Sequence, residues 1–213
     1  MYSDDRIKKV IELAFDAVSD TPILNEEFSA NGWCLPLDNG MVELYHYTVN
    51  SKLSKTESMA LFYANKFEEI IEPELRRESL LLVEPHNTML DECIKSYRCS
   101  YYSICIPALF SIIESMLVFL SNKGDFKQLK YSSSLNLRIA SGEFKNEELL
   151  NKLKEIRNVI SVLFSKISFD DAEKDKNTNR HASVHGRIER AYSQADALKL
   201  FALISLIKSC YEN

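Results

Sequence analysis

Two of the four histidines in the chain lie four residues apart, at His181 and His185, and Arg180 stands directly before the first of them. Imidazole rings can accept and donate protons near neutral pH, and a guanidinium can stabilise charge that develops on a phosphate. The surrounding residues, 179–186, read NRHASVHG. We expect this segment, called the RH segment below, to be the functional centre of the protein.

The RH segment is expected to form about two turns of helix. Asn179, or the residue before it, can cap the start of this helix, and Gly186 can end it in the left-handed conformation. On a regular helix the two histidines share one face, whereas Arg180 and His185 are about 140° apart around the axis. These two side chains can meet on one substrate if the turn is irregular, if Arg180 reaches around it, or if a second subunit supplies the matching residue.

Four interpretations of the RH segment compete. The simplest is a surface turn of ordinary polar residues. Metal binding through His181 and His185 would need a third ligand from elsewhere, and the chain has no HExxH motif. The other two are phosphoryl chemistry, with histidine as base or acid and arginine stabilising charge, and plain binding of an anion or nucleotide by the same groups. We expect neither a metal nor a cofactor.

The composition favours an all-helical protein in the cytoplasm. Of the 213 residues 46% are hydrophobic, and only five are glycine and five proline, which disfavours both disorder and turn-rich β folds. A net charge of −5 disfavours a protein that coats nucleic acid non-specifically. The five cysteines have no CxxC spacing and suit a reducing compartment. The charged N-terminus lacks the apolar region of a signal peptide.

The spacing of apolar residues predicts where the helices lie. We expect helices over 3–19, 54–71, 85–97, 100–122, 146–168 and 193–211, the last with Ser193 and Asp196 as a capping box. Pro73 breaks a helix or starts a new one. Residues 126–141 are ambiguous, and the charged stretch 168–178 reads as a loop. The stretch 20–50 holds β-favouring residues at 42–49, so we expect loops and a short hairpin there.

The most apolar stretch, 101–120, could be mistaken for a membrane span. It contains Pro107 and Glu114, and a carboxylate near the middle of a span would be costly in lipid. We therefore interpret it as a core helix and expect no membrane contact. Glu114 either lies on the wet side of this helix, which we favour, or is buried with a partner, for which Arg180 or a histidine is the obvious choice.

The RH segment resembles the signature of the HEPN superfamily. That signature is an arginine, often followed by Asn, Asp or His, and then a histidine four to six residues on; Arg180 to His185 fits it. Asn179 and Gly186 complete the NRHxxxHG form of many bacterial members. A second match lies upstream, where the run from Tyr101 to Glu114 resembles the central helix of the family, with its acidic residue after an apolar stretch.

The resemblance covers roughly residues 80–211 and implies the domain organisation. It predicts an all-α helical bundle of HEPN type at 80–213. Residues 1–79 would then form an N-terminal helical extension, with the loop-rich insert and short hairpin at 20–50. HEPN proteins often dimerise, so a homodimer is implied, in which two RH segments face each other in one composite site.

The resemblance also implies a reaction. Many HEPN proteins are metal-independent endoribonucleases of toxin–antitoxin or phage-defence systems, so RNA would be the substrate and an antitoxin or defence protein a partner. The 2′-hydroxyl of RNA would attack the adjacent phosphate, leaving a 2′,3′-cyclic phosphate and a 5′-hydroxyl. His185 would be base or acid and Arg180 would hold the phosphate. Asn179, His181 and Glu114 would support them.

Two further arginines, Arg187 and Arg190, follow the RH segment. Together with Arg180 they form either a basic cluster that guides an RNA backbone or a solvated charged turn. Two alternatives to the ribonuclease remain open. One is a non-catalytic HEPN-like module that binds a nucleotide, RNA or a protein, and the other is a metal-dependent hydrolase that uses His181 and His185.

Overall fold

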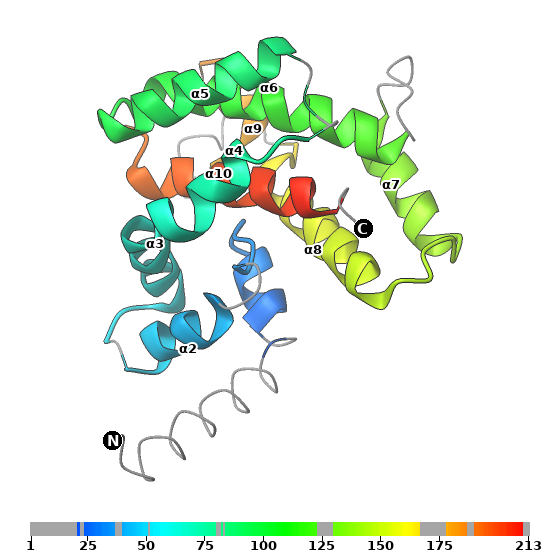
Figure 1. The fold of residues 1–213 in the computed structure, drawn as a ribbon, viewed down its shortest axis with the longest axis horizontal. Helices are drawn as coiled ribbons and strands as arrows, with labels where there is room; N and C mark the ends of the chain where they lie inside the picture. Colours follow the sequence, from blue (N-terminus) through cyan, green and yellow to red (C-terminus); the bar gives the residue numbers. More distant parts are fainter. Residues whose placement is uncertain are drawn as a thin grey trace, which may run out of the picture.

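The computed structural model describes residues 21, 24–36, 40–50, 52–79, 82, 84–122, 130–166, 178–186 and 190–210. Within these ranges the chain is mostly helical and has no strand (Figure 1), which confirms the all-α class. The helix expected at 3–19 and the side chain of Arg187 lie outside the described residues.

Ten labelled helical elements follow one another along the part of the chain that the structure describes. They are α2 (Gly40–Asn50), α3 (Lys55–Asn65), the π-helical turn η1 (Phe67–Ile71), α4 (Glu72–Arg76), α5 (Glu84–Arg98), α6 (Tyr102–Ser121), α7 (Tyr131–Ala140), α8 (Glu147–Leu163), α9 (Arg180–Val184) and α10 (Gln194–Ser209).

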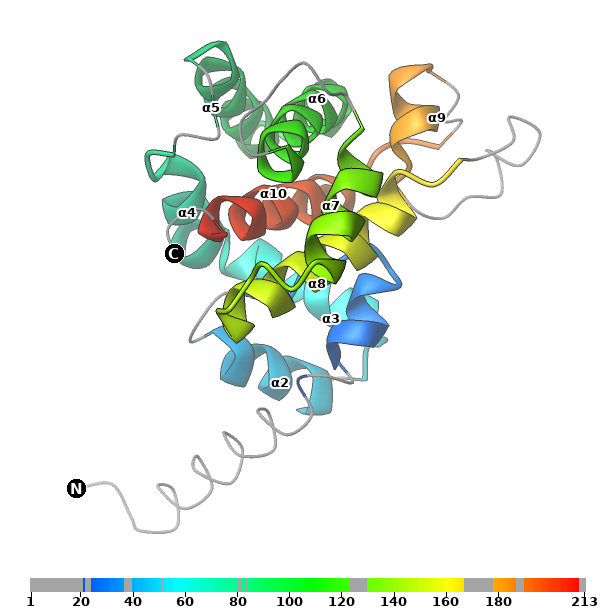
Figure 2. The same cartoon turned by 90° about the vertical axis from the view of Figure 1, so that its right-hand side faces the viewer.

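Helix α10 lies in the middle of the molecule. Figure 2 shows it with α5 and α6 on one side and α3 and α8 on the other, and it packs against α3, α4, α6 and α8. Every residue from Asp196 to Ser209 is buried. Ser193 starts the helix with the expected capping box, in which its side chain and that of Asp196 each accept a bond from the other's backbone.

Helices α5 and α6 form a tight pair. Figure 1 shows them side by side, and they make the most extensive contact between any two labelled elements. The link between them is short because Ser100 adopts a left-handed conformation (φ 61°) and the amide of Tyr101 donates to the carbonyl of Ser96 at 2.8 Å. This is the hydrogen bond of a Schellman motif, which closes the end of α5.

Helix α6 is long and apolar enough to cross a membrane by length and composition, with a mean hydropathy of 2.1 in its most apolar window, and no other described helix is. Over half of that window is buried within the protein, and α6 packs against α5, α7 and α10. The expectation of a core helix agrees with this packing. Pro107 lies inside α6, near its start.

The strand expected at 42–49 is wrong, because these residues belong to α2. Leu44 is fully buried, Tyr45 and Tyr47 pack at the edge of the core, and the ring of Tyr47 meets that of Phe62 of α3 edge to face. Residues 24–29 are helical as well. The β preference of aromatic and branched residues reflects how they pack on a sheet surface, and no sheet is present here to provide it.

The helix expected at 54–71 is divided into two elements. α3 begins at a capping box between Ser54 and Glu57 and ends at Asn65, and the wider turn η1 follows. Pro73 stands in the first turn of α4, where the missing amide proton costs nothing. Within the ambiguous stretch, α7 covers Tyr131–Ala140.

The segments on both sides of residue 80 share one hydrophobic core. Phe67, before this point, packs edge-on against Phe201 of α10 at 5.5 Å between ring centroids. Near the end of α10 the ammonium of Lys208, which is 1% exposed, donates to the carbonyl of Leu75 at 2.7 Å and to that of Arg77. The C-terminal carbonyls of α4 are thereby satisfied by a cation, as the helix dipole favours.

Glu155 of α8 ties residues 24–36 to the bundle. Its carboxylate accepts a hydrogen bond from the amide of Leu35 at 2.6 Å and another from the side chain of Asn25 at 2.9 Å. Burial raises the pKa of Glu155 to about 7, although both hydrogen bonds act to lower it. Removal from water destabilises the charged carboxylate, and the two hydrogen bonds stabilise it by a smaller amount, so the pKa rises.

This pKa predicts how stability depends on pH. Between the ordinary carboxyl value of 4.5 and about 7, the folded state keeps the proton of Glu155 and the unfolded state releases it. The free energy of unfolding should therefore fall as pH rises through this window, by about 3 kcal/mol from this group, and then level off. Chemical denaturation at a series of pH values measures the slope.

Glu155→Gln removes the titration and should flatten that part of the slope. Glu148→Gln, which removes an exposed carboxylate from the same helix, serves as the control and should leave the slope in place. The same slope in the wild type and in Glu155→Gln would contradict the assignment.

Candidate functional site

The RH segment folds as the five-residue helix α9 with a cap at each end. Asn179 is the N-cap, and its side-chain oxygen accepts from the amide of Ala182 at 3.1 Å. His185 is the C-cap, and its amide donates to the carbonyl of His181 at 3.3 Å. Gly186 follows with φ +63°, the left-handed conformation for which glycine is preferred after a helix.

Asn179 also fastens α9 to the end of α8. It is 1% exposed, and its amide nitrogen donates to the carbonyl and the hydroxyl of Ser165, at 2.9 Å and 3.1 Å. The hydroxyl of Ser183 donates back to the carbonyl of Asn179 at 2.6 Å. Asn179 thus has the capping role expected for it and also binds Ser165.

Arg180 joins α9 to α6 through Glu114. The guanidinium Nη2 lies 2.8 Å from Glu114 Oε2, and each side chain is about one third exposed, at 30% and 29%. Figure 2 shows α9 at one edge of the molecule, beside α6. Glu114 therefore lies between the exposed position that we favoured and the buried one, and it has the partner expected for the buried case.

Tyr131 of α7 is the third member of this cluster. Its hydroxyl donates to Glu114 Oε1 at 3.3 Å. Burial and the Glu114 carboxylate raise the pKa of Tyr131 to about 12, against the opposing effect of Arg180. The phenol thus keeps its proton and remains a donor. The Nε of Arg180 is buried and has no hydrogen-bond partner among the residues that the structure describes.

The imidazoles of His181 and His185 are in contact on α9. The rings of His181 and His185 meet edge to face, with centroids 4.7 Å apart and planes at 69°. His185 and the adjacent Val184 are exposed, whereas His181 is half-buried. Arg180 is thus directed at Glu114 while the histidines contact each other, and His185 is the motif side chain most open to a substrate.

Arg190 is held by a buried carboxylate. Its guanidinium binds Asp196 of α10 through two bonds of 2.7 Å each, and Asp196 is 4% exposed. Burial tends to raise the pKa of Asp196, but bonds from Arg190, Thr178 and Ser193 outweigh it and lower the pKa to about 2. The expected basic cluster therefore has its two described members, Arg180 and Arg190, already paired with carboxylates.

Sequence reasoning did not single out Ser165, Tyr131 or the site role of Asp196. Asp196 was expected only as a helix cap, because the capping spacing is local whereas its bonds to Thr178 and Arg190 come from the flanks of the RH segment. Tyr131 lies in the stretch that had no clear periodicity. No signal in the sequence connects it to Glu114.

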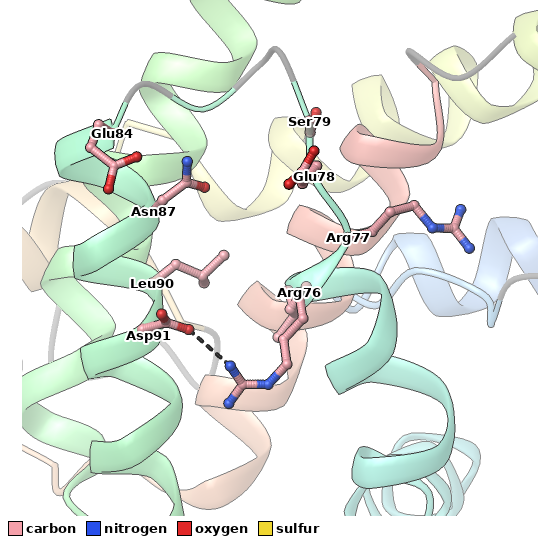
Figure 3. A pocket seen from close by; sticks show the side chains of 9 residues that line it. Arg76, Arg77, Glu78, Ser79, Glu84, Asn87, Leu90 and Asp91 are labelled. Carbon is pink, nitrogen blue, oxygen red and sulfur yellow. Dashed lines mark hydrogen bonds and ion pairs between the residues drawn. The ribbon is translucent and has the colours of Figure 1, made fainter.

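Two clefts formed by described residues lie away from the RH segment. One, of about 570 Å³, separates α4 from α5; Figure 3 shows Arg76 reaching across it to Asp91 while Arg77 points away. The other, of about 320 Å³, is lined by Phe67, Tyr97 and Gln194 among others. Neither is lined by the RH segment. Among the described side chains, no three His, Cys, Asp or Glu are grouped so that they could hold a metal ion.

The double role of Asn179 predicts an unusually costly substitution. Asn179→Ala removes an N-cap, worth about 1 kcal/mol, and also removes the hydrogen bonds of a buried amide to the carbonyl and hydroxyl of the part-buried Ser165, worth about 1–3 kcal/mol more. Asn146→Ala is the matched control, because Asn146 caps α8 through one bond to the amide of Leu149 and is exposed. Urea denaturation of both variants should show the larger loss for Asn179→Ala, and equal losses would contradict the prediction.

Comparison of the chain with protein-family models, with curated proteins and with solved structures found no match.

Proposed function

We propose that the protein is a cytoplasmic, metal-independent endoribonuclease of HEPN type that cleaves RNA in a composite site between two chains. A toxin–antitoxin or phage-defence system is the setting that this proposal implies. Its partners there would be RNA, a second copy of the chain, and an antitoxin or another defence protein.

One observation carries the proposal. The resemblance to HEPN proteins had two separate parts, the acidic residue of an apolar helix and the arginine of the RH segment. These residues, Glu114 and Arg180, are 66 positions apart in the sequence and meet in an ion pair of 2.8 Å. If either segment resembled HEPN proteins by chance, there would be no reason for Glu114 and Arg180 to meet. A functional site that uses both residues explains why they do.

Cleavage of RNA by its 2′-hydroxyl requires three chemical groups at the scissile phosphate: a base, an acid and a cation. A base takes the proton of the 2′-hydroxyl, whose oxygen then attacks phosphorus. An acid gives a proton to the 5′-oxygen as the bond from phosphorus to that oxygen breaks. A cation stabilises the charge on the phosphoryl oxygens between these events. His185 is exposed and suits proton transfer, and Arg180 suits the cationic role.

The geometry of one chain favours a site made by two. Arg180 is directed at Glu114, on α6, while His185 caps the other end of α9. A guanidinium has five N–H donors, so Arg180 can keep Glu114 and still bind a phosphate. A second chain related by two-fold symmetry would bring its His185 to the phosphate that Arg180 of the first chain holds, so that the imidazole, as base or acid, and the guanidinium come from different chains.

Cleavage of RNA by the purified homogeneous protein tests the activity. It should proceed in EDTA and leave 2′,3′-cyclic phosphate and 5′-hydroxyl ends. Arg180→Ala and His185→Ala should each lower the rate by roughly 100- to 10,000-fold. His46→Ala is the control, because His46 is exposed on α2, and it should keep the wild-type rate.

Retained cleavage in both site variants, with folding intact, would overturn the site assignment. A protein that binds RNA or a nucleotide without cutting it would favour the non-catalytic HEPN-like module instead. Cleavage that EDTA abolishes and zinc restores would favour the metal-dependent hydrolase.

Mixing two inactive variants tests the composite site. If Arg180 and His185 act from opposite chains, Arg180→Ala combined with His185→Ala should recover part of the activity after subunit exchange, since a mixed dimer holds one intact arginine and one intact histidine. Arg180→Ala mixed with the Arg180→Ala/His185→Ala double variant lacks every Arg180 and should stay inactive. No recovery in a mixture shown to contain mixed dimers would contradict a shared site.

A further inference from the structure

The two flanks of the RH segment bind the same carboxylate. Before the segment, the hydroxyl of Thr178 donates to Asp196 Oδ1. After it, Arg190 donates to both oxygens of Asp196 at 2.7 Å. The amide and hydroxyl of Ser193 donate to Oδ2, at 2.7 Å and 2.8 Å. Asp196 thus closes the chain between 178 and 190 into a loop at its base.

The carboxylate of Asp196 is held in place by the buried helix that carries it. Asp196 is 4% exposed and lies on α10, whose remaining residues up to Ser209 are all buried. Its lowered pKa, near 2, keeps it ionised at the pH values where proteins are normally studied. An ionised buried carboxylate needs donors around it, and Thr178, Arg190 and Ser193 supply them.

Helix α9 depends on such anchors for its position. It has five residues, far fewer than the roughly 12–15 that an isolated helix needs to be even marginally stable in water. Its placement must come from tertiary contacts. Those on the helix itself include Asn179 to Ser165 and Arg180 to Glu114. The bonds to Asp196 hold both ends of the loop that carries it.

We propose that Asp196 is a positioning residue of the ribonuclease site, which sets the placement of Arg180 and His185 without touching the RNA. This proposal rests on the proposed function for its catalytic part. It assigns Thr178 and Arg190 to the same role and removes Arg190 from the set of RNA contacts. A misplacement of about 1 Å in a catalytic group can cost about 100-fold in rate, so the closure of this loop matters to catalysis.

Amide hydrogen exchange tests the anchoring without any need for activity. The amides of Ala182, Ser183 and His185 are hydrogen-bonded within α9. In Asp196→Asn and in the milder Thr178→Val they should exchange about tenfold faster or more. Amides in the middle of α10 should keep their protection. If Asp196→Asn does not fold, Thr178→Val and Arg190→Gln decide the question.

Arg98→Gln is the matched control for Arg190→Gln. Arg98 also donates from a half-exposed guanidinium to a buried carboxylate, that of Glu72, at 2.7 Å, but it joins α5 to α4. Its loss should affect stability and leave both α9 exchange and RNA cleavage unchanged. Equal acceleration of α9 exchange in Arg98→Gln and Arg190→Gln would mean general loosening and would overturn the proposal.

The kinetic test separates positioning from RNA binding. In Arg190→Gln, kcat should fall by about tenfold or more while KM for RNA changes little. A Thr178→Val/Arg190→Gln double variant should lose less than the product of the single losses, since both act through one carboxylate. A rise in KM alone would make Arg190 an RNA contact and contradict the proposal. If the wild type does not cleave RNA, the proposed function fails, and exchange still decides whether Asp196 holds α9.

Discussion

The rest of the structure depends on the burial of α10 from Asp196 to Ser209. A helix surrounded on all sides has no wet stripe on which to place its charged residues, so each of them needs an internal partner. Asp196 binds the flanks of the RH segment and Lys208 binds the end of α4. Lys199 lies over the ring of Trp33, 5.4 Å from its centroid. The charges of one buried helix thereby fix three separate segments around it.

Much of the fold could be predicted because local patterns set it. The capping box at Ser193, the helix that begins after Asn146 and the close pairing of α5 with α6 follow from short-range rules of spacing and chain length. The helix α10 was predicted, but its burial on all sides was not. Lys199 and Lys208 suggest a solvated face, and only the elements packed around them show that these residues are buried.

In the candidate site, too, the local features could be predicted from the sequence and the long-range contacts could not. The arginine, the histidines and the capping residue were visible in one stretch of eight residues. The partners of that stretch lie on α6 and just after α8, those of its flanks lie on α10, and no periodicity points to them. The prediction of a strand at 42–49 was wrong for a related reason. β preference competes with tertiary packing, and in α2 the burial of Leu44 favours a helix. Sequence patterns report which groups are present, whereas pairing over long separations is decided by the packed core.

The contacts of α10 with the first part of the chain have a consequence for modularity. The portion that resembles HEPN proteins begins near residue 80, yet Phe201 and Lys208 inside it are covered by Phe67 and by the carbonyls of Leu75 and Arg77. Trimming the chain at residue 79 would leave an aromatic ring and an ammonium group on a bare surface. The described residues from Phe67 to Arg77 therefore cover part of the central helix, and the portion after residue 80 would lose this packing without them.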